Sequence, residues 1–92
     1  MSGGIVDDFG PIAAEIEQEL GRAQMKFAPL HSGHEAQSVI AEEFHELSLA
    51  IWFGVDQHGQ AADPRTEAIQ LAAMAIRFIL DVVAPVSVEV MK

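Results

Sequence analysis

The chain has 92 residues, half of them hydrophobic, with 14 acidic and 5 basic side chains and a formal net charge of −9. This length makes one domain with a small core, which a partner chain would help to complete. The negative charge disfavours binding to nucleic acid, and the absence of cysteine excludes disulfides, thiolate zinc sites and a cysteine nucleophile. With neither a signal peptide nor a membrane-spanning stretch in the sequence, we expect a soluble, cytoplasmic protein with no membrane partner.

A first helix is predicted from Pro11 to about Phe27. Residues 1–10 contain three glycines and are expected to form a flexible lead. From Pro11 onward, apolar residues recur at steps of three and four, and proline suits the first turn of a helix. This segment should therefore be an amphipathic helix.

A second helix is predicted to begin after Ser32 and to end at about Phe53. Ser32 can cap it, with Glu35 three residues later at the spacing of a capping box. One stripe of this helix is wholly apolar and is expected to face the interior. The stripe consists of Ile40, Phe44, Leu47 and Ile51.

A third helix is predicted from Pro64, capped by Asp63, to about Val83. Its middle is apolar almost all round, yet too short to span a bilayer, which takes ~20 residues. It should therefore be buried between neighbouring helices or subunits. We expect a single all-α domain over 11–84, a three-helix protomer that forms a four-helix-bundle dimer or tetramer. The tail, 85–92, alternates valines with polar residues and is left unassigned.

The second helix carries two carboxylates on an apolar stripe. Glu43 and Glu46 share this stripe with Val39, Ala50 and Phe53. Burying two like charges is costly unless one is protonated or a cation pairs with them. A divalent metal ion would neutralise both charges at once.

The third helix repeats this pattern with Glu67 and, one turn later, Gln70. In an antiparallel pair of helices these two side chains could meet Glu43 and Glu46. Carboxylate and amide oxygens are hard ligands that suit Mg²⁺ or Mn²⁺. Glutamates are also common on solvated helix faces, so the acidic string by itself is weak evidence for a site.

Two segments resemble the MazG-like nucleotide pyrophosphohydrolases: AEEFHEL at 41–47 and EAIQLAAMAIRF at 67–78. KFAPLHSGHE at 26–35 looks like the segment that precedes their acidic helix, and the resemblance covers 14–82. That family carries EExxE followed by ExxD, and Gln70 stands where its aspartate would be. The resemblance implies hydrolysis of a nucleoside triphosphate to the monophosphate and pyrophosphate, in a dimeric or tetrameric assembly.

The resemblance also implies roles for the acidic residues. Glu43, Glu46 and Glu67 are the expected Mg²⁺ ligands, with Gln70 as an outer ligand. Glu42 and Glu43 are the expected catalytic residues. Glu42 would bind a second metal or orient the attacking water, and a solvent-facing role is its alternative.

Two further residues are candidates for binding the substrate. Lys26 resembles a basic residue that precedes the acidic helix in this family and could neutralise phosphate charge, while a surface role is its ordinary alternative. His34 precedes the same helix and could approach a nucleotide. Arg77 is expected to pair with an acidic residue or a subunit instead.

Two alternatives to the enzyme stay open. The chain could be a non-catalytic oligomerisation or nucleotide-sensing module, in which Gln70 marks a weakened metal site. It could also be a purely structural bundle that binds a partner.

Overall fold

The computed structural model describes residues 2–83, and these form an all-α fold, as predicted. Helix α1 spans Ser2–Lys26, α2 spans Gly33–Phe53 and α3 spans Pro64–Phe78. A short π-helical turn, η1 (Ile79–Val83), continues α3 to the end predicted for it. The tail over 85–92 lies outside the described residues.

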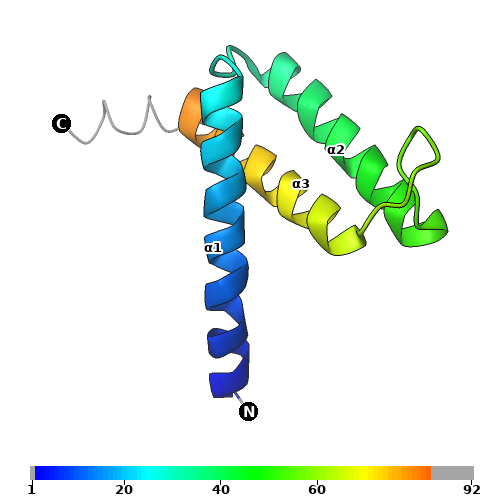
Figure 1. The fold of residues 1–92 in the computed structure, drawn as a ribbon. Helices are drawn as coiled ribbons and strands as arrows, with labels where there is room; N and C mark the ends of the chain where they lie inside the picture. Colours follow the sequence, from blue (N-terminus) through cyan, green and yellow to red (C-terminus); the bar gives the residue numbers. More distant parts are fainter. Residues whose placement is uncertain (1, 84–92) are drawn as a thin grey trace.

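Helix α1 is longer than the sequence predicted. The predicted start at Pro11 is wrong, because the residues expected to form a flexible lead continue the helix back to Ser2. Proline within a helix removes one backbone hydrogen bond, yet Pro11 does not end this helix. The N-terminal part of α1 extends well past the other two helices (Figure 1), and Phe9 within it is 62% exposed.

The caps of α2 confirm the predicted boundaries of this helix. The Ser32 hydroxyl accepts a hydrogen bond from the Glu35 backbone N–H at 3.1 Å, and the Glu35 carboxylate accepts one from His31 N–H at 2.7 Å. At the other end, Gly54 adopts a left-handed conformation with φ 69°, which glycine reaches without strain. These local bonds fix where the acidic segment begins and ends.

The loop between α2 and α3 folds on itself through Asp56. One oxygen of its carboxylate accepts hydrogen bonds from the backbone N–H groups of Gln60 and His58, and these bonds lower the pKa of Asp56. Asp63 then caps α3 by accepting from Arg65 N–H, with Pro64 in the first turn as predicted. The loop thus returns the chain antiparallel to α2.

Helix α3 is the central element. It packs against both α1 and α2, which scarcely touch each other, and Figure 1 shows it between them. Ala23, Ala73 and Met74 form the buried core. Arg65 Nη2 also donates to Glu15 Oε2 at 2.6 Å, which ties α3 to α1. Among residues 2–83, no helix is long and apolar enough to cross a membrane.

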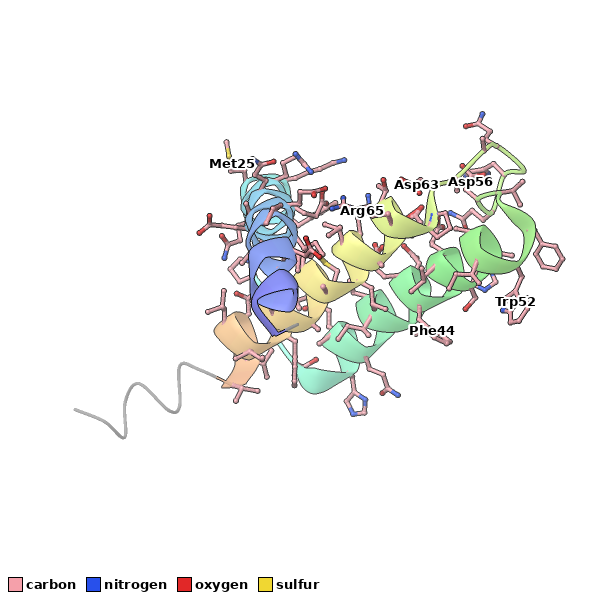
Figure 2. All side chains as sticks on the ribbon, turned by 90° about the horizontal axis from the view of Figure 1, so that it is seen from below. Met25, Phe44, Trp52, Asp56, Asp63 and Arg65 are labelled. Atoms are coloured by element: carbon pink, nitrogen blue, oxygen red, sulfur yellow. The ribbon has the colours of Figure 1, made fainter. Side chains whose placement is uncertain are left out.

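Helix α2 turns a different side inward from the one predicted. Ala36 and Ala50 are buried, whereas Phe44 and Ile51 are 61% and 56% exposed. The prediction that their stripe faces the interior is therefore wrong for the single chain. Small residues allow α2 and α3 to approach closely, which favours the alanine side. Phe44 and Trp52 point away from α1 and α3 (Figure 2).

Candidate functional site

The α2–α3 hairpin brings the predicted acidic residues together. Burial and, after it, the charges of Glu67, Glu46, Glu42 and Glu19 in that order together raise the pKa of Glu43 from 4.5 to about 6. Two of these neighbours lie on α2, and the other two come from α3 and α1. Glu43 is therefore the residue whose pKa is affected by carboxylates on all three helices.

Glu67 is the second carboxylate of the site whose pKa is raised. Its Oε2 atom is buried and has no hydrogen-bond partner among the described residues. Burial raises the pKa of Glu67, and the charges of Glu46 and Asp56 add to the effect. A buried carboxylate oxygen without a partner favours either a proton or a cation beside it.

Glu19 on α1 belongs to the site as well, although the acidic motifs of the sequence do not include it. A signal for it exists, because Glu15, Glu19, Arg22 and Lys26 recur at steps of four, three and four. This spacing defines a polar stripe along one side of α1. The Arg22 guanidinium donates to Glu19 Oε1, with Nε at 3.2 Å. The stripe brings both basic and acidic side chains to the site.

A hollow of about 360 Å³ lies beside Glu43, between α1 and α3, and we call it the basic hollow. Lys26 and Gln70, two of the predicted site residues, line it together with Glu43. Glu46 and Glu67 are not among its lining residues. The full lining is Glu19, Arg22, Ala23, Lys26, Phe27, Glu43, Thr66, Gln70 and Met74.

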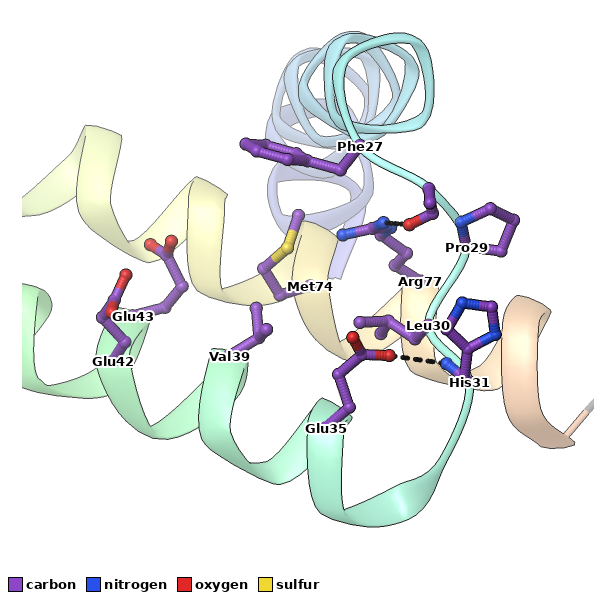
Figure 3. A pocket seen from close by; sticks show the side chains of 11 residues that line it. Phe27, Pro29, Leu30, His31, Glu35, Val39, Glu42, Glu43, Met74 and Arg77 are labelled. Carbon is purple, nitrogen blue, oxygen red and sulfur yellow. Dashed lines mark hydrogen bonds between the residues drawn. The ribbon is translucent and has the colours of Figure 1, made fainter.

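A second hollow of similar volume, about 360 Å³, lies beside the segment between α1 and α2, and we call it the loop hollow (Figure 3). Glu42, which is exposed, lines it together with Glu43. The two hollows share Phe27, Glu43 and Met74, so they adjoin along these side chains. His34 is exposed and lines neither of them, whereas His31 lines the loop hollow.

Arg77 forms part of the wall of the loop hollow. Its side chain is only 4% exposed. Its guanidinium donates to the Ala28 carbonyl, and its Nε lies 3.5 Å from Asp81 Oδ2. The prediction that Arg77 pairs with an acidic residue is confirmed.

The donor set suits a hard divalent cation in its chemistry, since it offers carboxylates from α2 and α3 and an amide oxygen at Gln70. The unpartnered Glu67 Oε2 is the atom that most needs such a cation. As their side chains lie, however, no three acidic or histidine residues within the described part of the chain are grouped so as to hold a metal ion. Side-chain rotation would have to bring Glu43, Glu46 and Glu67 closer to one another.

Comparisons with known protein families, with curated proteins and with solved structures find no match to this chain. The resemblance to MazG-like enzymes therefore rests on the motif residues themselves, chiefly Glu42, Glu43, Glu46 and Glu67.

Proposed function

We propose that the protein hydrolyses a nucleoside triphosphate to the monophosphate and pyrophosphate with Mg²⁺ as cofactor. The observation that carries the proposal is the pKa of Glu43, which burial and four neighbouring carboxylates raise to about 6. Like charges gathered at a partly buried position destabilise a fold. Such an arrangement is typical of functional sites, where cations or protons relieve the repulsion.

The proposed ligands are Glu43, Glu46 and Glu67, with Gln70 as an outer oxygen donor; Mn²⁺ would substitute for Mg²⁺. When bound, Mg²⁺ supplies charge neutralisation at the phosphates and lowers the pKa of a water molecule. Glu42 lies beside Glu43 at the solvent edge, where its carboxylate can accept the proton of a water that attacks the α-phosphorus.

The basic hollow offers a place for the phosphates. Lys26 and Arg22 line it on the α1 side, opposite Gln70 on α3. Its lining holds two cations and two carboxylates, Glu19 and Glu43, so in a chain with a net charge of −9 this is a region of balanced charge, where Lys26 and Arg22 can approach an anionic ligand. We include Lys26 and Arg22 among the substrate-binding residues and leave out His34, which lines neither hollow.

The test is hydrolysis by the purified protein of a panel of ribo- and deoxynucleoside triphosphates with Mg²⁺, followed by chromatography of the products. We expect monophosphate and pyrophosphate, with a loss of at least about a hundredfold in rate for Glu43→Gln. Glu17→Gln is the matched control, because Glu17 is exposed on α1 and lines neither hollow. Equal rates for wild type and Glu43→Gln, or no turnover of any nucleotide, would count against the enzyme.

A non-catalytic nucleotide-sensing module is the second candidate. Two observations favour it: Gln70 is neutral where a charged ligand would hold a metal more tightly, and the described carboxylates are not grouped as a metal site. This candidate predicts calorimetric binding of nucleotide and Mg²⁺ with no release of pyrophosphate.

We also propose that the protein acts as a homo-oligomer, a dimer or a tetramer. The support is the apolar surface of α2, where Phe44, Ile51 and Trp52 are each more than half exposed. A cluster of this kind on a small domain is typical of an interface. A second copy of α2 against it would complete a four-helix arrangement.

A further inference from the structure

The loop hollow is lined by side chains that suit a flat ring. Phe27, which is 55% exposed, lies on one side of it, and Val39 and Leu30 lie on the other (Figure 3). Its volume of about 360 Å³ falls at the small end of ligand pockets, which begin at roughly 300 Å³. The Arg77 guanidinium lies over part of the Phe27 ring, with Cζ 5.8 Å from its centroid. An aromatic ring with a guanidinium beside it and aliphatic side chains opposite is suited to stacking a nucleobase.

The polar groups that line this hollow are mainly acceptors. Three carboxylates line it, those of Glu35, Glu42 and Glu43, with His31 as the exposed residue able to donate. Glu35 Oε1 accepts from His31 N–H at 2.7 Å, and Figure 3 shows the other oxygen turned away from that bond, between Val39 and Leu30.

Arg77 adds little to the donors of the hollow. Its side chain is almost fully covered; one guanidinium nitrogen donates to the Ala28 carbonyl, and Nε, which has no hydrogen-bond partner among the described residues, lies 3.5 Å from the Asp81 carboxylate on the side away from solvent. A carboxylate-lined pocket attracts groups that donate hydrogen bonds and repels ring carbonyls. Adenine, cytosine and guanine each carry an exocyclic amino donor, whereas uracil and thymine present two carbonyls around one N–H.

We propose that the loop hollow binds the base of the nucleotide and selects bases that carry an exocyclic amino group, with Glu35 as the acceptor. This inference rests on the proposed function, because it places the phosphates in the basic hollow. Glu43, Phe27 and Met74 lie where the two hollows meet, so one extended nucleotide would pass beside Glu43 between its base and its phosphates.

The test measures binding apart from turnover. Deoxynucleoside monophosphates are titrated in the presence of EDTA, with backbone amide NMR shifts as the readout. We expect dAMP, dCMP and dGMP to bind on the order of tenfold more tightly than dTMP and dUMP, since one specific carboxylate-to-base contact discriminates by about this factor. The largest shifts should fall within residues 27–35 and near Glu43.

Glu35→Gln is the decisive variant. Its amide oxygen can still accept from His31 N–H, while the charge is lost and a donor is gained, so the preference should shrink or reverse. Glu17→Gln is the control, and its preference should equal that of wild type. If Glu35→Gln unfolds, Glu35→Asp replaces it, because it keeps the negative charge of the cap but withdraws the carboxylate from the hollow by one methylene group, so the preference should again shrink.

The outcomes separate this inference from the proposed function. Equal or tighter binding of dTMP and dUMP, no binding of any monophosphate, or shifts away from residues 27–35 would overturn the base site. So would an unchanged preference in Glu35→Gln or in the variant that replaces it. If triphosphates are hydrolysed but monophosphates bind without base preference, the proposed enzyme activity stands and the base site is rejected. If monophosphates bind selectively but no triphosphate is hydrolysed, the base site stands and the enzyme activity is rejected.

Discussion

Arg77 Nε lies 3.5 Å from Asp81 Oδ2, and the same carboxylate oxygen accepts a hydrogen bond from Leu30 N–H at 2.8 Å. The Arg77 guanidinium also donates to the Ala28 carbonyl (Figure 3). The π-helical turn after α3 supplies Asp81. The end of α3 is thus bonded at two points, Ala28 and Leu30, to the segment that lines the loop hollow. Arg77 and Asp81 therefore hold in place the segment between α1 and α2, which lines the proposed base site.

Replacing Arg77 with methionine should destabilise the fold by about 3 kcal/mol, because breaking a buried ion pair leaves the partner charge without compensation. Urea denaturation followed by circular dichroism measures the change. Arg22→Met is the control, since its pair with Glu19 is on the surface, with the Arg22 side chain 68% exposed. That loss should be below about 1 kcal/mol. Equal losses for the two variants would contradict the structural role of Arg77.

The stability of the metal-free protein should fall as the pH rises through the titration of Glu43. Its pKa is raised from 4.5 to about 6 in the folded chain, so the unfolded state releases this proton first. The penalty is absent below pH 4.5, grows up to about pH 6 and is complete above it. Because solvent reaches part of the side chain, we expect a penalty on the order of 1 kcal/mol.

Glu43→Gln should therefore be more stable than wild type at pH 7.5, with the difference vanishing near pH 4. Urea denaturation in EDTA across this range checks it, and Glu17→Gln should show no such pH-dependent gain. A difference that stays constant with pH, or a variant that is less stable at pH 7.5, would contradict the charge repulsion around Glu43.

The helix boundaries that depend on local chemistry could be predicted from the sequence. The Ser32 cap and the Pro64 start act within a few residues, and they were confirmed. The rotation of α2 could not be predicted, because two adjacent stripes are both largely apolar. Close packing at Ala36 and Ala50 determines which of the two stripes faces inward. That packing depends on the position of α3, which a local pattern in α2 does not contain.

The same distinction holds for the site. The meeting of Glu43 and Glu67 follows from two helical spacings and an antiparallel turn, both visible in the sequence. The place of Glu19 depends on how α1 crosses α3, which no local pattern specifies. His34 is predicted to approach the nucleotide because it lies close in sequence to the acidic helix. It lines neither hollow, whereas His31 lines the loop hollow.

Mg²⁺ should raise the thermal unfolding temperature, since a ligand that binds only the folded state stabilises it. At a concentration about 100 times its Kd the gain is about 2.7 kcal/mol. Glu43→Gln and Glu67→Gln should lose most of this gain, whereas Glu17→Gln should retain it. Differential scanning fluorimetry at pH 7.5, with and without EDTA, is the measurement. An Mg²⁺ effect that is absent, or that is the same in all the variants, would exclude the glutamates as ligands.

The exposed aromatic side of α2 should be the oligomer interface. Wild-type protein at micromolar concentration should sediment as more than one chain, and the double variant Phe44→Glu with Trp52→Glu should sediment as a monomer, because an apolar interface does not accommodate unpaired charges. Met25→Glu is the control, since Met25 is 92% exposed and lies on the far side of the molecule from Phe44 and Trp52 (Figure 2). Its assembly should match that of wild type. If the wild type sediments as a monomer, the proposed interface is contradicted. If the double variant still sediments as an oligomer, the interface lies on another face.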